Sequence, residues 1–280
     1  MEYLTGSSPS RFQRLRDRFR PRLGTILLLL QLLVLVLPLA ALTGLRIYES
    51  ALIRQTENAL VSQAAFIAAV FAGELDRAPK YSPGLKPQPK VCPPAPVTPK
   101  GEWQLRPPTL DLADDPVLPE APRPTPASVL PLQWAEHSAL PVQQLMKSAQ
   151  KITLSAMRLT DCFGTVVATT GSDLSQSMLV RDEVEKALRG EQVSVMRARN
   201  EKMERSWASI SRGAGLRVTV VMPVEWKKRV VGAVLLERTP ASVFDTLWGK
   251  RTELALGLAM LIVLVALLAF LAAYFISGPI

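Results

Sequence analysis

Two long uncharged stretches constrain this chain of 280 residues more than any other feature. Residues 23–45 and residues 254–280 contain no charged side chain, and they are 23 and 27 residues long. A helix of about 20 apolar residues is long enough to cross the hydrocarbon core of a bilayer, which is about 30 Å thick. The sequence therefore predicts two transmembrane helices, over residues 23–45 and 253–276, and a lipid bilayer as a partner.

The segment before the first stretch predicts the orientation of the chain. Residues 1–22 carry six arginines against Glu2 and Asp17, and we interpret them as a basic cytoplasmic tail, because positive charge is retained on the cytoplasmic side. Residues 46–252 then lie outside the cytoplasm, and in a bacterium the chain would be a multi-pass inner-membrane protein with a periplasmic domain. A cleaved signal peptide is the alternative, but its apolar core of about 7–15 residues is shorter than this stretch.

Residues 46–76 are predicted to continue the first span as a helix. Apolar side chains such as Leu60 and Phe71 recur there at steps of three and four residues. The opposite, polar face is predicted to carry Arg54 and Glu57. This helix would pack on its twin in a homodimer or on its own domain, and the pattern leaves both open.

Residues 79–131 form a segment of different composition, because they hold sixteen of the 23 prolines. Proline lacks a backbone N–H and fixes φ, so neither a helix nor a sheet is expected to run through this segment. The composition predicts an extended insert rich in polyproline II conformation, part of it disordered. A surface excursion is the favoured interpretation, and a proline-rich motif that binds another protein is the alternative.

The rest of the predicted domain mixes helices with strands. Short helices are expected over residues 137–150 and 180–189, the second ended by Gly190. Period-two alternation and β-branched residues predict strands over residues 153–160, 165–170, 191–199, 206–212, 216–224 and 229–237. Tight turns are expected at 161–164 and 225–228. A helix that begins at Pro240 is expected to run on through the membrane.

Four short motifs between the two spans resemble those of a single Cache domain, the PAS-like extracytoplasmic sensor domain. They are Asp161-x-x-Gly164-x-Val166-Val167-Ala168-Thr169, Glu183-Val184-x-x-Ala187-Leu188-x-Gly190, Val218-x-Val220-x-Met222-Pro223-Val224 and Val231-Gly232-Ala233-Val234-Leu235-Leu236. Residues 276–280 are similar to the start of a HAMP linker, which is marked by a proline after the membrane. The resemblance covers about residues 20–280, and it is to the input half of a sensor histidine kinase of a two-component system.

This resemblance implies the fold class and the partners. The fold would be α+β, with a PAS-like antiparallel sheet and a long N-terminal helix, flanked by two transmembrane helices. A HAMP linker would begin at residues 277–280. The phosphoacceptor helix and the ATP-binding domain of such a kinase would follow it, so ATP and a response regulator are expected only through those parts.

The residues themselves indicate little catalytic chemistry. His137 is the only histidine in the sequence and is predicted to be a surface residue. One histidine and two cysteines do not make a tetrahedral zinc site without carboxylates, and no glycine-rich phosphate-binding motif occurs. We expect no catalytic residue, no metal and no cofactor in this chain. Nucleic acid is disfavoured as a partner, because the basic residues are predicted outside the cell.

Basic residues concentrate between Arg197 and Arg229, where nine of them occur with three acidic residues. They would bind a small anionic ligand, lie on anionic lipid headgroups, or form solvated strand faces, and the last interpretation is favoured. Arg212 or Arg217 would hold a carboxylate or phosphate through paired hydrogen bonds. Ligands of the resembling family bind between the sheet and its loops, which implies as ligand-binding residues Trp207, Ser209, Ser211, Arg212 and Arg217.

Cys92 and Cys162 are the only two cysteines of the sequence. A disulfide is permitted outside the cytoplasm, and it would tie the proline-rich insert to the first hairpin. Two free thiols are the favoured interpretation, since spacing alone does not decide the geometry.

The favoured function is a signal-sensing module of the membrane. It would pass an extracytoplasmic ligand signal through the second transmembrane helix to a HAMP linker, as the input half of a histidine kinase. A chemoreceptor and a diguanylate cyclase would share the same input half. A stand-alone membrane-anchored scaffold, acting through the proline-rich insert, is the alternative from another functional class.

Overall fold

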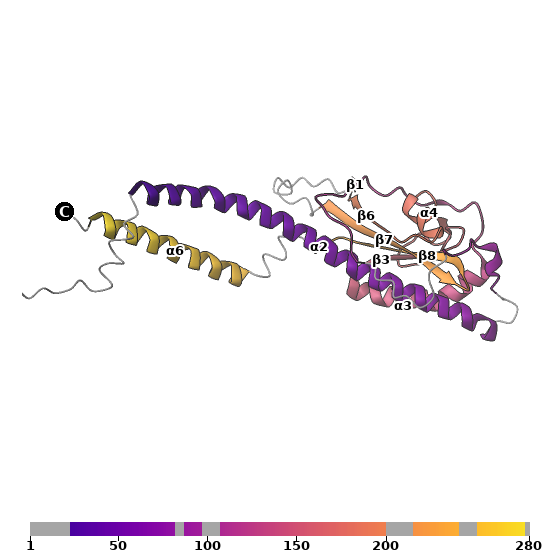
Figure 1. The fold of residues 1–280 in the computed structure, drawn as a ribbon. Coiled ribbons are helices and arrows are strands. Elements are labelled where there is room, and N and C mark those ends of the chain that lie inside the picture. The colour runs from indigo at the N-terminus through magenta and orange to yellow at the C-terminus, as the bar shows by residue number, and fades with distance from the viewer. Residues whose placement is uncertain (1–22, 82–86, 97–106, 200–214, 241–250, 278–280) are drawn as a thin grey trace, which may run out of the picture. The chain divides into compact units, whose positions relative to one another are not determined.

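The computed structural model describes residues 23–81, 87–96, 107–199, 215–240 and 251–277. Helices and short strands alternate along the chain (Figure 1). In order they are α2 (Leu23–Tyr81), the 3₁₀ helix η1 (Pro89–Val91), β1 (Val117–Leu118), β2 (Thr125–Pro126), α3 (Gln133–Thr153), β3 (Ala156–Asp161), β4 (Val166–Thr169), β5 (Gln176–Ser177), α4 (Asp182–Leu188), β6 (Val193–Ala198), β7 (Leu216–Trp226), β8 (Arg229–Arg238) and α6 (Arg251–Ser277).

The chain divides into two compact units. Residues 46–246 form the larger unit, which holds the sheet. Residues 1–45 and 247–280 form the smaller unit, which holds the start of α2 and the whole of α6. The expected helix over residues 253–276 is confirmed as a helix, while its expected continuity from Pro240 depends on residues outside the described ones.

One helical stretch among the described residues, Thr43–Ala78 of α2, is long and apolar enough to cross a membrane by length and composition. It begins where the expected span over residues 23–45 ends. Its side chains Leu60, Phe71 and Leu75 are buried in the core of the larger unit. We therefore assign this stretch to the domain, because an apolar helix face that packs on a sheet is not available to lipid.

Six strands form one sheet in the order β1-β6-β7-β8-β3-β4. Neighbours in this sheet pair antiparallel, except that β1 lies parallel to β6. The predicted α+β fold, with a long N-terminal helix and a mainly antiparallel sheet, is thus confirmed, and so are five of the predicted strands. The remaining predicted strand, over residues 206–212, lies outside the described residues.

The hairpin between β7 and β8 turns at Lys227 and Lys228, which have φ values of 48° and 61°. Two consecutive left-handed residues are typical of the two-residue type I′ turn, whose twist matches that of antiparallel strands. The predicted tight turn is therefore present, but it spans residues 226–229 and not 225–228. Trp226 is still part of the strand, where its ring is buried and its indole N–H donates to Asp76 at 2.9 Å.

The two faces of the sheet are covered differently (Figure 1). α2 and α3 pack on one face, where Leu60, Phe71 and Leu236 belong to the larger hydrophobic core. α4 lies on the other face, over a smaller core that includes Val184 and Leu235. Because side chains alternate along a strand, the neighbours Leu235 and Leu236 of β8 point into different cores.

The proline-rich insert contributes to the sheets, so the expectation that no sheet would run through residues 79–131 is wrong. β1 adds to the edge strand β6, and β2 pairs antiparallel with β5. Both strands are two residues long and need few N–H donors, which explains why an edge position tolerates proline. The side chain of Leu110 also joins the larger core.

A disulfide between Cys92 and Cys162 ties the beginning of the insert to the turn between β3 and β4, with the Cα atoms 5.6 Å apart. Hydrogen bonds fix the same segment to β8. The N–H of Val230 donates to the carbonyl of Pro93 at 3.0 Å, and the guanidinium of Arg229 donates to the carbonyl of Cys92 at 2.8 Å. Three parts of the chain are thus joined at this point.

The expectation that Glu57 lies on the solvent face of α2 is wrong. Glu57 is only 1% exposed, and its Oε2 accepts a hydrogen bond from the N–H of Leu110 at 2.9 Å. The insert folds over this part of α2 and supplies the donor that a buried carboxylate requires. The helix therefore packs on its own domain here, while packing on a twin stays a prediction.

Candidate functional site

Six arginines line one cavity of about 370 Å³ in the larger unit. They come from the insert, from three strands and from the loops that flank α4 and β6: Arg123, Arg158, Arg181, Arg197, Arg199 and Arg217. Glu120 and Glu237 also line the cavity. Such a concentration of guanidinium groups is typical of a site that recognises carboxylate or phosphate.

Strand pairing explains why several of these arginines meet. Arg197 lies directly opposite Arg217 in the β6–β7 pair, and Arg158 lies directly opposite Leu235 in the β3–β8 pair. Glu237 is two residues beyond Leu235 on β8 and therefore projects from the same face. Leu235 belongs to the core under α4, so the cavity lies on the α4 side of the sheet.

Glu237 is the centre of the charge network in this cavity. Its Oε2 lies 2.6 Å from Nη1 of Arg158, and its Oε1 lies 2.8 Å from Nη1 of Arg181. Arg158 also pairs with Asp173, and Arg181 donates to the carbonyl of Pro122 at 3.3 Å. The buried carboxylate thus holds two arginines that come from opposite ends of the site.

Arg197 has a partner of its own on α4. Its Nε and Nη2 donate to the two oxygens of Glu183 at 3.1 and 2.7 Å, which is the bidentate geometry of a strong pair. Its Nη1 donates to the carbonyl of Pro119 at 3.1 Å. Glu183 lies in the first turn of α4, where a negative charge also favours the helix dipole.

The carboxylates of this network are held in the charged form. Burial by itself raises the pKa of Glu237, but the charges of Arg181 and Arg158 and their hydrogen bonds outweigh it, so this pKa lies below its ordinary value. The pKa of Asp173 is also lowered, because hydrogen bonds from Arg158 and Thr169 outweigh the effect of burial. The network is therefore ionic at neutral pH.

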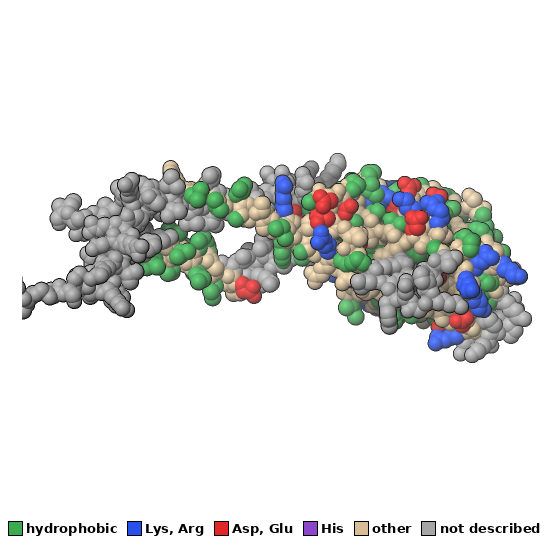
Figure 2. Space-filling model, in the orientation of Figure 1, with side chains coloured by type: hydrophobic (Ala, Val, Ile, Leu, Met, Phe, Trp, Pro, Cys, Tyr) green, Lys and Arg blue, Asp and Glu red, His purple; other side chains and the backbone are tan. Residues whose placement is uncertain are grey.

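Positive charge exceeds negative charge around the cavity. Six arginines stand with four carboxylates, which are Glu120, Asp173, Glu183 and Glu237. Acidic and basic side chains are also intermixed on the surface of the larger unit that Figure 2 shows. The cavity keeps an excess of two positive charges, and an anion would compensate it.

Arg217 is the arginine best placed to meet a ligand. Its side chain is 41% exposed, and its contact with Glu237 is long, at 4.0 Å between Nη1 and Oε2. It lies directly opposite Arg197, whose charge Glu183 already compensates. Arg217 is therefore the less compensated of these two arginines.

A buried hydroxyl near the cavity has no hydrogen-bond partner among the described residues. Thr219 of β7 pairs directly with Glu237 of β8, and its side chain is fully buried. Its Oγ1 neither donates nor accepts a hydrogen bond. A buried polar group without a partner is destabilising, and such groups concentrate where function has shaped a structure.

The structure brings together one of the five ligand-binding residues that the resemblance implied, namely Arg217. The other four lie outside the described residues: Trp207, Ser209, Ser211 and Arg212. Sequence reasoning missed Arg158, Arg181 and Glu237. The sequence does contain one indication of Glu237, because this charged residue directly follows the apolar run of β8 at a position that faces a core.

Among the described residues, no group of three or more His, Cys, Asp or Glu side chains has the geometry to hold a metal ion. His137 is exposed on α3, as the sequence predicted, so that prediction is confirmed. The arginine lining of the cavity supports electrostatic binding of an anion by guanidinium groups.

No protein-family model matches this chain, and no curated protein matches it. Among solved structures, six chains match, and one of them is the sensor domain of the histidine kinase DctB from V. cholerae. The two sequences are 12% identical, the TM-score is 0.28, and the match covers 36% of this chain and 37% of that one. This weak similarity to a sensor domain spans little more than a third of the solved chain, so the proposals below rest on the residues of this chain.

Proposed function

We propose that this chain is a membrane-anchored signal-sensing module whose α+β domain binds a small anion in the arginine-lined cavity. The observation that carries this proposal is the meeting of six arginines and four carboxylates around one cavity. A volume of about 370 Å³ lies at the small end of ligand sites. A compact carboxylate or phosphate therefore fits this site better than a large ligand.

Glu237 would be the internal competitor of the ligand. It occupies Arg158 and Arg181 at 2.6 and 2.8 Å, and a bound anion would compete for the same donors. Release of Glu237 would change the end of β8, which stops at Arg238. The same chain continues to α6 at Arg251, so a change at this strand end acts on the segment that leads into that helix.

The membrane anchoring would come from residues 23–45 and from α6. Both are uncharged over the length of a bilayer core, and the described side chains of the middle of α6 are mostly exposed and apolar. A helix that is apolar on all sides is stable in lipid rather than in water. The basic tail would place residues 46–252 in the periplasm of a bacterial inner-membrane protein, an oxidising compartment in which the disulfide persists.

The output would be that of the resembling family. The chain would act as a homodimer and as the input half of a two-component histidine kinase, with a HAMP linker from residue 277 and a response regulator as a later partner. A test is to join residues 1–280 to the HAMP and kinase parts of a characterised sensor kinase. Anion-dependent phosphorylation of the response regulator is expected, and phosphorylation that ignores every anion would contradict this part of the proposal.

Anion binding is tested on the full chain in lipid nanodiscs. Calorimetric titrations with phosphate, sulfate, monocarboxylates and dicarboxylates should find at least one ligand. Arg217→Gln should weaken its binding about tenfold or more, because a hydrogen bond between charged groups contributes about 1.5–3 kcal/mol. Arg189→Gln is the matched control, since Arg189 is exposed and its one ion pair among the described residues is with Glu185 on α4.

Two results would overturn this assignment of the cavity. One is the absence of binding for every anion in the panel. The other is equal binding by the wild-type chain and by Arg217→Gln, since the ligand would then lie elsewhere.

A further inference from the structure

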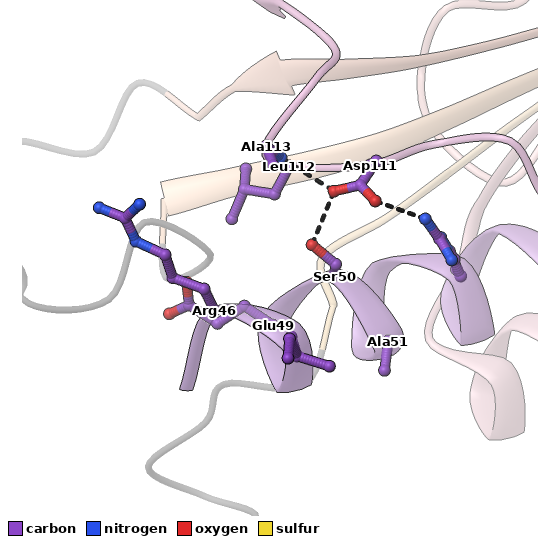
Figure 3. A pocket seen from close by; sticks show the side chains of 9 residues that line it. Arg46, Glu49, Ser50, Ala51, Asp111, Leu112 and Ala113 are labelled. Atoms are coloured by element: carbon purple, nitrogen blue, oxygen red, sulfur yellow. Dashed lines mark hydrogen bonds and ion pairs between the residues drawn. The ribbon is translucent and has the colours of Figure 1, made fainter. Parts of the chain in front are cut away.

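A second and larger cavity, of about 560 Å³, lies at the beginning of the domain part of α2 (Figure 3). Its polar lining comes from the first turns after the uncharged stretch of residues 23–45 and from the insert: Arg46, Glu49, Ser50, Arg54 and Asp111. Ile47 and Leu112 add apolar lining. The cavity thus combines both signs of charge with apolar surface.

Asp111 is fully engaged in this cavity. Its Oδ1 accepts hydrogen bonds from the hydroxyl of Ser50 and the N–H of Ala113, both at 2.9 Å, and its Oδ2 pairs with Arg54. The first two of these contacts are drawn in Figure 3, where Asp111 and Ser50 face each other. The hydrogen bonds from Ala113 and Ser50 lower the pKa of Asp111 below its ordinary value. This carboxylate needs no further partner.

Glu49 differs from Asp111 because one of its oxygens has no donor among the residues that the structure describes. It is only 4% exposed, yet its Oε1 accepts no hydrogen bond from any residue that the structure describes. A buried carboxylate oxygen without a donor is strongly unfavourable. A ligand that carries N–H donors and a positive charge would remove this cost, and a primary ammonium has both.

The cationic groups lie beside this carboxylate on the same helix. Arg46 is exposed and forms no ion pair with any residue that the structure describes, and Arg54 is half exposed while it holds Asp111. Figure 3 shows Arg46 and Glu49 on the same part of α2, at the side of the cavity. The two arginines offer guanidinium donors to a phosphate close to the group that Glu49 would bind.

The position of this cavity along the helix indicates the source of such a ligand. Arg46 follows the last residue of the uncharged stretch, and a helix rises about 1.5 Å per residue. Arg46 to Ser50 therefore lie within about 8 Å of the end of that stretch. The headgroup layer on each side of a bilayer is about 5–8 Å thick, so these residues are at headgroup depth if residues 23–45 cross the membrane.

We propose that this cavity binds the headgroup of an aminophospholipid of the phosphatidylethanolamine type. Its ammonium donates to Glu49, its phosphate accepts from Arg46 and Arg54, and Ile47 contacts the start of the acyl chains. A choline headgroup lacks N–H donors and leaves Glu49 unsatisfied. This inference rests on the proposed membrane anchoring, and it is independent of the anion cavity.

The test is lipid retention by the full chain. The chain is extracted from vesicles of equal parts phosphatidylethanolamine, phosphatidylglycerol and phosphatidylcholine, and bound lipid is identified by native mass spectrometry. The ethanolamine lipid should be enriched about tenfold over the choline lipid, as one hydrogen bond between charged groups predicts. Glu49→Gln should abolish this enrichment, and Glu74→Gln, on the same helix, should keep it.

Further measurements separate the remaining outcomes. Arg46→Gln should lower retention of all three lipids, since each carries a phosphate, and thermal melting should show that each variant is folded. Preferential retention of phosphatidylglycerol, or binding of soluble phosphoethanolamine without lipid enrichment, would overturn the assignment. Flotation with vesicles tests the anchoring itself: a chain that fails to float contradicts the proposed function, whereas a chain that floats without lipid preference contradicts only this inference.

Discussion

The two faces of the central sheet are built from different chemistry. The face under α2 and α3 is closed by apolar side chains, among them Phe71, Met146 and Leu236. The face under α4 begins in the same way, around Val184 and Leu235, but ends in a network of arginines and carboxylates. One sheet therefore carries a face that stabilises the domain and a face whose stability depends on charge.

This difference has a consequence for how each face responds to its surroundings. Apolar burial contributes roughly 25 cal/mol per Å² and is nearly independent of pH and small ions. A buried ionic network depends on each of its charges, because the loss of one charge leaves the others without compensation. If the cavity binds an anion as proposed, the α4 face is the one on which a small ligand or a proton would change the structure.

The largest effect is expected on the apolar face. Phe71→Ala should lower the free energy of unfolding by roughly 3–5 kcal/mol, because a fully buried aromatic ring is lost and a cavity remains. Phe66 lies on the same helix but is 61% exposed. Phe66→Ala should therefore change the free energy of unfolding by less than about 0.5 kcal/mol. Urea unfolding measures both. Equal losses for the two variants would contradict the assignment of the α2 face to the core.

A somewhat smaller loss is expected for the charged face. Glu237→Gln should lower the free energy of unfolding by roughly 3 kcal/mol, since Arg158 and Arg181 lose their shared carboxylate. A ligand anion should restore much of this loss, because it stabilises the folded state by mass action. Thermal melting with and without phosphate measures the recovery. The same anion should stabilise Phe71→Ala only as much as it stabilises the wild-type chain, because the arginine cavity is unchanged in this variant. A larger recovery for Phe71→Ala than for the wild type would break the contrast between the faces.

The pH dependence of stability should also distinguish the two regions. The pKa values of Glu237 and Asp173 are lowered in the folded state, so their contribution is present above the ordinary carboxyl pKa and is lost as the pH falls through the folded values. Asp161 in the β3–β4 turn has the opposite sign, since burial raises its pKa despite hydrogen bonds from Leu132, Thr165 and Phe163. Its contribution increases on acidification.

Urea unfolding between pH 7 and pH 3 measures these signs. The wild-type chain should lose stability on acidification, and Asp173→Asn should reduce the slope. Asp161→Asn should instead make the loss of stability on acidification steeper. The carboxyl of Asp161, whose protonation favours the folded state, is absent from this variant. A shallower slope for Asp161→Asn would refute the assignment of its raised pKa.

The smallest effect is expected at two buried threonines on the α4 face. Thr219→Val should be neutral or stabilise by up to about 1 kcal/mol, because the Oγ1 that it removes has no partner among the described residues. Thr160→Val should destabilise by about 1 kcal/mol, because its Oγ1 accepts from the N–H of Ala233 at 3.2 Å. Chemical denaturation of the pair measures the difference, and a loss at Thr219 would show that its hydroxyl has a partner.

The apolar face could be predicted from the sequence, and the charged face could not. Runs of apolar and β-branched residues located β7 and β8, which are buried on both faces. Three- and four-residue steps located Phe71, because a helix buried on one face leaves a periodic trace. Arg158, Arg181 and Glu237 come from distant segments, and the strand register together with the placement of α4 brings them together. A sequence pattern contains no information about which distant charges become neighbours.

Glu57 illustrates a second reason for the difference. The sequence pattern predicted that this charged residue lies on the solvent face of α2. The backbone N–H of Leu110 donates a hydrogen bond to it, and this makes its burial acceptable. The proline-rich composition of residues 79–131 gave no sign that the insert returns to α2 and adds strands at sheet edges. Single-residue preferences describe what a segment favours alone, not what a neighbouring segment supplies.

The disulfide between Cys92 and Cys162 closes a covalent ring around the insert, with a sequence separation of 70 residues. A protease that cuts the backbone once inside this ring opens the circle but releases no fragment. The nicked chain would migrate as one band on a denaturing gel without reductant and as two bands with it. Arg123 lies inside the ring, so one side of the arginine-lined cavity would stay attached to the domain after such a cut.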